Sequence, residues 1–169
     1  NEPFAVMLAD DFIDAERSVM GQMVDLYEYE RASILGVQEV AREATASYGI
    51  VRAKQLSERL EQVEGIVEKP KPAEAPSTLG VIGRYILTPA IFAHLKRINP
   101  GAGGEIQLTD GIASLMAAER VLAYRFEGTR YDCGSKLGYL KATVALGLKH
   151  PEVGEAFAEY LRTGPGNAA

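Results

Sequence analysis

Acidic side chains follow two of the strands that the sequence predicts. Asp10 and Asp11 come directly after the apolar run of residues 4–8. Asp132 follows the strand expected at 121–126. Ligands of open α/β sheets collect at the carboxyl ends of strands, and Mg²⁺ favours hard oxygen ligands while keeping waters and phosphate oxygens in its remaining positions. Carboxylates from two strands could therefore hold Mg²⁺ beside a phosphorylated substrate.

The same aspartates have an ordinary structural interpretation. Asp11 and Asp14 could simply begin the next element at a turn. Asp132 could be the N-cap of a helix expected at 135–149, although Ser135 competes for that position. The spacing alone leaves the choice between a metal site and a turn open.

A second set of residues suits a sugar phosphate. Glu68 and Lys69, in the stretch VEKPKP, lie at the end of the strand expected at 59–68. A carboxylate accepts hydrogen bonds from hydroxyls and an ammonium group meets phosphate, but a solvated strand end explains the pair about as well. Gly49, in SYGIV, lies inside the strand expected at 47–56, where a glycine often marks a bulge or the close approach of a ligand.

Composition and motif content narrow the function classes. The net charge of −5 argues against nucleic acid, whose phosphates attract clustered Lys and Arg. No apolar run is long enough to cross a bilayer, so no membrane partner is expected. The single cysteine, Cys133, has no histidine near it in sequence, which favours a buried apolar role, and it fits a reducing, cytoplasmic setting. The HExxH, GxSxG and zinc-ligand spacings are absent.

The elements that must position these residues follow from hydrophobic periodicity. A strand at 4–9, a helix at 18–29 and a strand at 33–40 form a crossover unit, which is typical of an α/β sheet. Further strands are expected at 47–56, 59–68, 79–87 and 121–126, and further helices at 89–95, 135–149 and 152–161. The glycine-rich loop of residues 99–110 is expected to enter another helix, which continues to residue 118. The continuous apolar run at the start predicts a strand buried on both faces with a neighbour on each side. We therefore expect the chain to be a piece of a longer protein.

Six stretches occur in one order along the chain: FAVMLADD, SYGIV, GIVEKPKP, GRYILTP, GAGGEIQLTD and RFEGTRYDCGSKLGYLKA. Together they resemble the bacterial UDP-glucose pyrophosphorylases (UTP–glucose-1-phosphate uridylyltransferases), a branch of the sugar-nucleotidyltransferase family. The resemblance covers roughly residues 3–150, and GGEIQLTD and YDCGSKLGYL are its most specific parts. The glycine-rich GxGTR-type loop with which the family opens is missing, so the resemblance begins in the middle of the family pattern.

The resemblance implies a fold and a domain organisation. The fold would be a Rossmann-like α/β three-layer sandwich with a mixed, mostly parallel sheet, truncated at its N-terminus. Residues 1–150 would form the sugar- and metal-binding part of a nucleotidyltransferase domain, and residues 151–169 a C-terminal helix and tail. The nucleotide-binding half would be absent, and the chain alone would be inactive.

The resemblance also implies roles for particular residues. Asp10 and Asp132 match the aspartates that bind Mg²⁺, which favours the metal interpretation. Glu68 matches the residue that accepts hydrogen bonds from glucose hydroxyls, and Lys69 the catalytic residue that contacts phosphate. Gly49 matches the glycine whose backbone lies against the sugar. Asp11 has no assured counterpart.

The implied reaction joins UTP and glucose-1-phosphate into UDP-glucose and pyrophosphate, in a homo-oligomeric enzyme. Two alternatives stay open. A related nucleotidyltransferase would use dTTP or another sugar-1-phosphate, because the base-reading residues lie largely in the missing segment. A non-catalytic module would bind sugar nucleotides and oligomerise through the helices expected at 135–149 and 152–161.

Overall fold

The computed structural model describes residues 2–101 and 104–164, and it divides into two compact units. The first unit contains Asn1–Leu8 and Ala15–Gly128, and the second contains Ala9–Asp14 and Thr129–Ala169. The functional division expected at residue 150 stays a prediction. That residue lies inside the second unit, between two of its helices.

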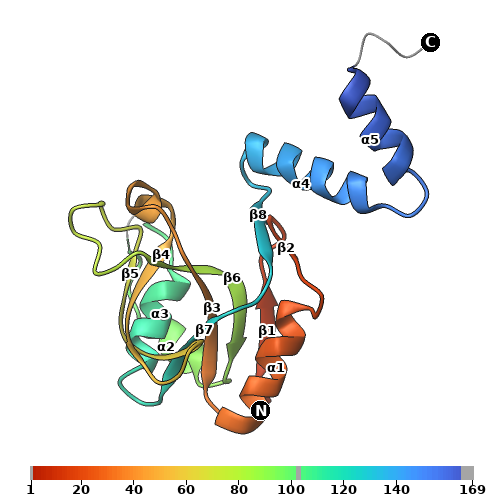
Figure 1. Cartoon of the computed structure of the whole chain (residues 1–169). Coiled ribbons are helices and arrows are strands. Elements are labelled where there is room, and N and C mark those ends of the chain that lie inside the picture. The colour runs from red at the N-terminus through yellow and green to blue at the C-terminus, as the bar shows by residue number, and fades with distance from the viewer. Residues whose placement is uncertain (1, 102–103, 165–169) are drawn as a thin grey trace. The chain divides into compact units, whose positions relative to one another are not determined.

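The first unit is built on a six-stranded mixed sheet (Figure 1). In spatial order its strands are β1 (Phe4–Met7), β6 (Leu79–Leu87), β3 (Ser33–Glu39), β7 (Val121–Arg125), β5 (Leu60–Glu68) and β4 (Gly49–Gln55). The sheet is mixed, as expected, but its expected predominance of parallel strands is wrong. Among the described strands only β3 and β7 pair in parallel. β4 pairs with both β5 and β6, so five of the strands form a closed ring.

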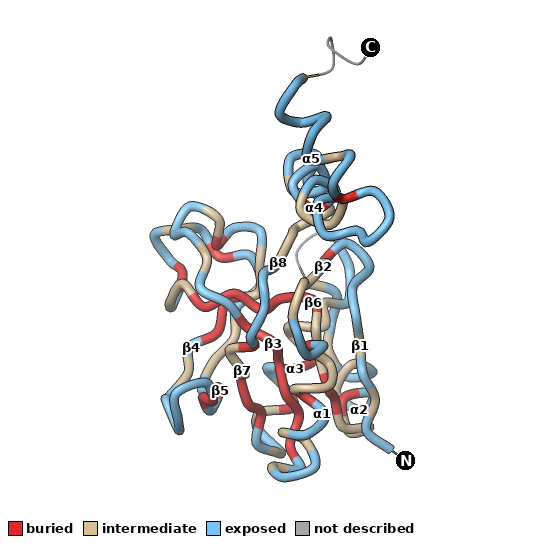
Figure 2. The backbone as a smooth tube through the Cα atoms, turned by 45° about the vertical axis from the view of Figure 1, so that its right-hand side comes forward, coloured by how far each residue is buried: buried red, intermediate tan, exposed pale blue. Residues whose placement is uncertain are grey.

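Strand β1 corrects the expectation of a strand buried on both faces. Among the described residues it pairs with β6 alone, and exposed and partly buried residues alternate along it. The side chain of Met7 is 62% exposed, whereas Leu35 in β3 is fully buried. Figure 2 shows the same contrast between β1 and the buried strands β3 and β7. β1 is therefore an edge strand with one covered face, for which alternation is the usual pattern.

Helices cover both faces of this sheet, which confirms the three-layer arrangement for the first unit. They are α1 (Val19–Glu30), α2 (Ile91–Leu95) and α3 (Leu108–Leu115), with a 3₁₀ helix, η1 (Arg42–Ser47), between β3 and β4. Successive residues of a strand point to opposite faces. Leu35 and Val37 pack in one core cluster with Ile91 of α2 and with residues of α3. A Cβ at Gly36 would instead lie 3.1 Å from Arg84 Cβ and 3.6 Å from the sulfur of Met23 in α1.

The second unit joins two distant pieces of the chain. β2 (Asp11–Asp14) and β8 (Thr129–Asp132) form an antiparallel ladder in which Asp11 lies opposite Asp132. Helices α4 (Lys136–Lys149) and α5 (Gly154–Thr163) follow. The helices were expected from periodicity, but the two four-residue strands were not, because DFID and TRYD are short and mix charged with apolar residues.

Candidate functional site

Three elements of the first unit converge on the Glu68 carboxylate. Gly49, the first residue of β4, lies opposite Glu68, the last residue of β5. Thr109, in the first turn of α3, donates a hydrogen bond from Oγ1 to Glu68 Oε2 at 2.5 Å. A Cβ added at Gly49 would lie 3.2 Å from Thr109 Oγ1 and 3.4 Å from Glu68 Oε2. The structure thus brings together Gly49 and Glu68, as the sequence predicts, and adds Thr109.

Lys69 extends this cluster with an exposed cation. Its Nζ lies 3.6 Å from Glu68 Oε1, and 60% of its side chain is exposed against 22% for Glu68. Its backbone has a φ of 44°, a left-handed conformation that is uncommon for residues other than glycine. Its N–H donates to Tyr48 O at 2.9 Å, and the buried Pro70 follows. The backbone around Lys69 is therefore anchored while the ammonium group stays accessible.

The two predicted metal-binding aspartates come together in the second unit. Asp10 directly precedes β2, and Asp132 is the last residue of β8. Cys133 N donates to Asp10 O at 2.7 Å, which joins the two segments beyond the end of the ladder. A Cβ added at Gly134 would lie 3.0 Å from Asp10 Oδ2 and 3.2 Å from Asp132 Oδ1. Both carboxylates therefore face the same glycine.

The hydrogen bonds around Asp132 decide which residue caps helix α4. Ser135 is the N-cap, since its hydroxyl accepts a hydrogen bond from Gly138 N at 3.0 Å. Asp132 Oδ1 instead accepts from Gly134 N at 3.1 Å, within the turn. Asp11, which the resemblance left without a role, is buried and forms an ion pair with Arg130. Asp132 is therefore not the N-cap of α4, and the carboxylate of Asp11 is engaged by Arg130.

The donor set at Asp10 and Asp132 fits Mg²⁺ but not a metal held by protein ligands alone. Among residues 2–101 and 104–164, no group of three or more His, Cys, Asp or Glu side chains could hold a metal ion. In the same part of the chain, neither aspartate has an ion-pair partner. Mg²⁺ commonly uses one or two carboxylates and fills its other positions with water and substrate phosphate. Two unpaired carboxylates at one turn meet that requirement.

Gly138 allows the turn that carries Asp132 to lie against helix α4. A Cβ at this position would lie 1.8 Å from Asp132 O and 2.7 Å from Asp132 C, which are backbone atoms. We expect Gly138→Ala to destabilise the protein by about 1–3 kcal/mol, because the turn must move to relieve the overlap. The free energy of unfolding, measured in urea by circular dichroism, checks this.

Gly65→Ala is the matched control for that substitution. A Cβ at Gly65 would approach the Arg52 side chain no closer than 3.6 Å, an ordinary contact. Its free energy of unfolding should change by less than about 0.5 kcal/mol. Equal stability of the two alanine variants would contradict the proposed close approach at Gly138.

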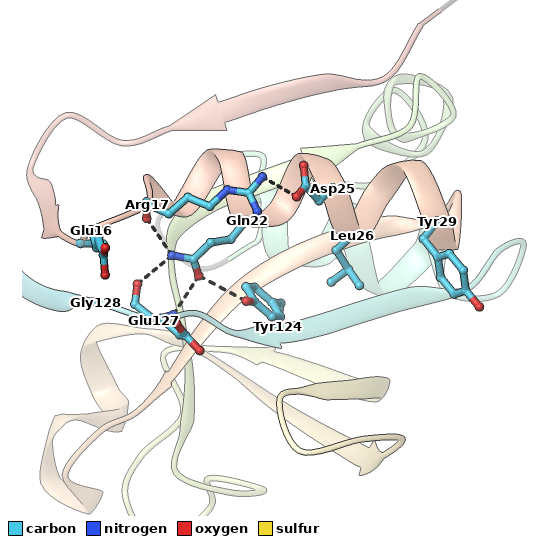
Figure 3. A pocket seen from close by; sticks show the side chains of 10 residues that line it. Glu16, Arg17, Gln22, Asp25, Leu26, Tyr29, Tyr124, Glu127 and Gly128 are labelled. Carbon is cyan, nitrogen blue, oxygen red and sulfur yellow. Dashed lines mark hydrogen bonds and ion pairs between the residues drawn. The ribbon is translucent and has the colours of Figure 1, made fainter.

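A cavity lies elsewhere in the first unit, between α1 and the end of β7 (Figure 3). Its volume is about 840 Å³, and neither Glu68 nor Lys69 lines it. The Gln22 amide donates to Arg17 O and Glu127 O, and its oxygen accepts from Glu127 N and Tyr124 OH. Burial raises the pKa of Tyr124, and the nearby Glu127 carboxylate acts in the same direction. Both donors and both acceptor positions of Gln22 are thus used within the protein.

Thr109 is the residue that sequence reasoning missed. It lies in GGEIQLTD, one of the most specific stretches of the resemblance, but it is 41 positions from Glu68. A threonine near the start of a helix is ordinarily interpreted as a capping residue. Only the position of α3 beside the end of β5 reveals its contact.

The family model described as nucleotidyl transferase matches residues 1–147. The chain is 45% identical to UTP–glucose-1-phosphate uridylyltransferase 2 of Staphylococcus saprophyticus over 96% of this chain and 56% of that protein. It is also 45% identical to the UTP–glucose-1-phosphate uridylyltransferase of Bacillus subtilis, over 95% and 55% of the two chains. The chain therefore spans somewhat more than half the length of these relatives.

Solved structures of similar proteins agree with the fold. A UDP-glucose pyrophosphorylase complexed with UDP-glucose superposes with a TM-score of 0.85 at 46% identity, over 89% of this chain and 58% of that one. The UTP-bound enzyme from Acinetobacter baumannii superposes with a TM-score of 0.83 at 40% identity, over 94% and 55%. These findings confirm the resemblance expected from the sequence, and the chain belongs to the nucleotidyl transferase family.

Proposed function

We propose that this chain supplies the sugar- and metal-binding part of a UTP–glucose-1-phosphate uridylyltransferase. The observation that carries the proposal is its 45% identity to enzymes of that name over nearly the whole chain. The cluster of Gly49, Glu68 and Lys69 supports it, because it offers a carboxylate for sugar hydroxyls beside an exposed cation for phosphate.

In the proposed reaction, a phosphate oxygen of glucose-1-phosphate attacks the α-phosphorus of UTP. The new P–O bond forms as the bond to pyrophosphate breaks, so no covalent enzyme intermediate is needed. Glu68 would accept hydrogen bonds from the glucose and fix its orientation. Lys69 would neutralise the attacking phosphate, so that its contribution is charge stabilisation and positioning.

We propose Mg²⁺ as the cofactor, with Asp10 and Asp132 as its protein ligands. Two carboxylates facing one glycine, neither with an ion-pair partner among the described residues, support this assignment. When bound, Mg²⁺ would offset the negative charge of phosphate oxygens. Asp10, just before β2, and Asp132, at the end of β8, would hold their carboxylates near Gly134.

The test is UTP formation from UDP-glucose and pyrophosphate, with Mg²⁺, by the full-length protein. Rapid UTP formation is expected, and the isolated 169-residue chain should form none. A folded, Mg²⁺-supplied full-length protein that forms no UTP would rule out uridylyl transfer. A panel with dTTP and other sugar-1-phosphates decides the alternative within the family, and inactivity with all of them favours a non-catalytic binding module.

The location proposed for the protein is the cytoplasm, and the proposed ligands are small molecules rather than nucleic acid. The net charge of −5 argues against nucleic acid, and the single cysteine fits a reducing compartment. Among the described residues, no helix combines the length and the apolar character needed to span a membrane.

A second copy of the chain is the proposed protein partner, docking through helix α4. Leu137, Leu140 and Leu148 of this helix are 62%, 59% and 43% exposed, and Ala142 is its only buried residue. The helix carries lysines and no acidic residue, whereas Glu152 and Glu155 lie just beyond its end. Two α4 helices packed antiparallel about a two-fold axis would cover the leucines. Lys136, at the start of each helix, would then lie near Glu152 and Glu155, which follow the other helix.

Leu140→Glu is expected to lower the molar mass of the full-length protein in light scattering, because it places two charges at the centre of this contact. Tyr29→Glu, at an 85% exposed position on α1, serves as the control and should leave the mass unchanged. A monomeric wild type, or a Leu140→Glu variant of wild-type mass, would contradict docking through α4.

A further inference from the structure

Thr109 makes a short hydrogen bond to an acidic residue of the candidate sugar site. The distance of 2.5 Å from its Oγ1 to Glu68 Oε2 is typical of a hydroxyl that donates to an ionised carboxylate. An ionised carboxylate has no proton to donate and can only accept hydrogen bonds, so the hydroxyl of Thr109 must be the donor. The bond joins the start of α3 to the end of β5.

The two oxygens of Glu68 consequently have different surroundings. Oε2 is bonded to Thr109, whereas Oε1 lies 3.6 Å from Lys69 Nζ. The terminal torsion of a glutamate is broad, so an unrestrained carboxylate would rotate freely. The bond from Thr109 restricts this rotation, and it leaves Oε1, on the side of Lys69, available to a ligand. The missing side chain of Gly49 leaves room beside Thr109 Oγ1 and Glu68 Oε2.

We propose that Thr109 is a positioning residue that orients the Glu68 carboxylate toward a hydroxyl of the sugar phosphate. The inference rests on the proposed function of this site and assigns to α3 a part in selecting the sugar. Thr109 acts through Glu68 and needs no contact with the substrate. Its hydroxyl, rather than its bulk, is what the role requires.

The experiment compares Thr109→Val with Thr109→Ser in the full-length protein. Valine keeps the shape of threonine and removes the hydroxyl, so kcat/KM for glucose-1-phosphate should fall about tenfold or more. The KM for UTP should change less than twofold. Serine keeps the hydroxyl and should restore most of kcat/KM. Deoxy analogues of glucose-1-phosphate, each lacking one hydroxyl, provide a second readout. Removing the hydroxyl that donates to Glu68 should lower kcat/KM less in Thr109→Val than in the wild type.

Thr78→Val is a matched control. Thr78 Oγ1 donates to Glu39 Oε2, also at 2.5 Å, so the variant removes the same kind of bond from another Thr–Glu pair. Its KM for glucose-1-phosphate should equal that of the wild type. Wild-type kinetics for Thr109→Val, or equal losses in the valine and serine variants, would overturn the proposal. So would equal rises in the KM for UTP and for the sugar phosphate.

Binding separates this inference from the proposed function. Calorimetry measures the affinity of the full-length protein for glucose-1-phosphate without UTP, and therefore without any transfer. If the wild type binds the sugar phosphate but transfers no uridylyl group, the proposed function is contradicted. The affinities of the Thr109 variants for glucose-1-phosphate then still decide whether Thr109 positions Glu68. If the wild type does not bind glucose-1-phosphate at all, the inference fails.

Discussion

Lys69→Ala in the full-length protein is expected to lower kcat by about 10²- to 10³-fold, the usual cost of removing one group that stabilises transition-state charge. The substitution should have little effect on the stability of the folded state. The side chain is 60% exposed, and its only ion-pair contact among the described residues is with Glu68 at 3.6 Å. The free energy of unfolding should therefore change by less than about 0.5 kcal/mol. Steady-state rates at saturating substrates, together with unfolding in urea, check both parts.

Lys71→Ala is the control for this prediction. Lys71 lies two residues further along the same loop, is exposed, and contributes only its backbone carbonyl to the local turn. Its alanine variant should keep wild-type kcat. A wild-type kcat for Lys69→Ala would reject the catalytic role, and similar losses in both variants would reduce that role to the general charge of the loop.

Asp132→Asn is expected to raise the Mg²⁺ concentration for half-maximal rate by about tenfold or more. The substitution removes a negative charge next to the proposed cation. A divalent cation and a carboxylate oxygen about 2.1 Å apart attract by about 4 kcal/mol even at the dielectric constant of water, more than the roughly 1.4 kcal/mol that a tenfold change requires. The turn should survive, because Asn keeps the oxygen that accepts from Gly134 N. Rates measured across a Mg²⁺ titration, with Mn²⁺ binding followed by paramagnetic resonance, provide the check.

Asp14→Asn controls for the general loss of a carboxylate from the same two-stranded ladder. Asp14 forms an ion pair with Lys149, whose pKa is raised by the hydrogen bond from its ammonium group to this carboxylate. Its side chain is therefore engaged, and the Mg²⁺ dependence should stay that of the wild type. A wild-type titration for Asp132→Asn would count against Asp132 as a ligand.

The sequence predicted most elements of the first unit, and helix α4 of the second, because each has a strong local pattern. The strand at residues 79–87 and the helices near 19–30 and 136–149 agree with the structure to within one residue. Whether each pair of strands runs parallel or antiparallel was harder to predict. β3 and β7 pair in parallel, whereas the other pairs described in this sheet are antiparallel. Among these pairs only β4 and β5 are consecutive strands, and no local pattern contains the direction in which strands distant in the sequence pair.

The candidate site shows the same division between local and distant information. Glu68 and Lys69 are adjacent in the chain, so their pairing could be inferred from the sequence. The contact between Thr109 and Glu68 could not, because it depends on how α3 packs beside β5. Asp10 and Asp132 were matched only through the family resemblance. The ladder that places them side by side is too short and too polar to be recognised from periodicity.

The ladder between β2 and β8 can form only late in synthesis, because its two strands lie far apart in the chain. Its ion pair joins Asp11 to Arg130 across 119 positions, so closing this loop costs about 4 kcal/mol of chain entropy. On the ribosome the two strands emerge roughly 6 to 24 s apart. Strand β1 and the residues from Ala15 to Gly128 can assemble during that interval, leaving β2 as an open loop on the nascent chain. The contact between Glu68 and Thr109 can therefore form before the segment that contains Asp132 has been synthesised.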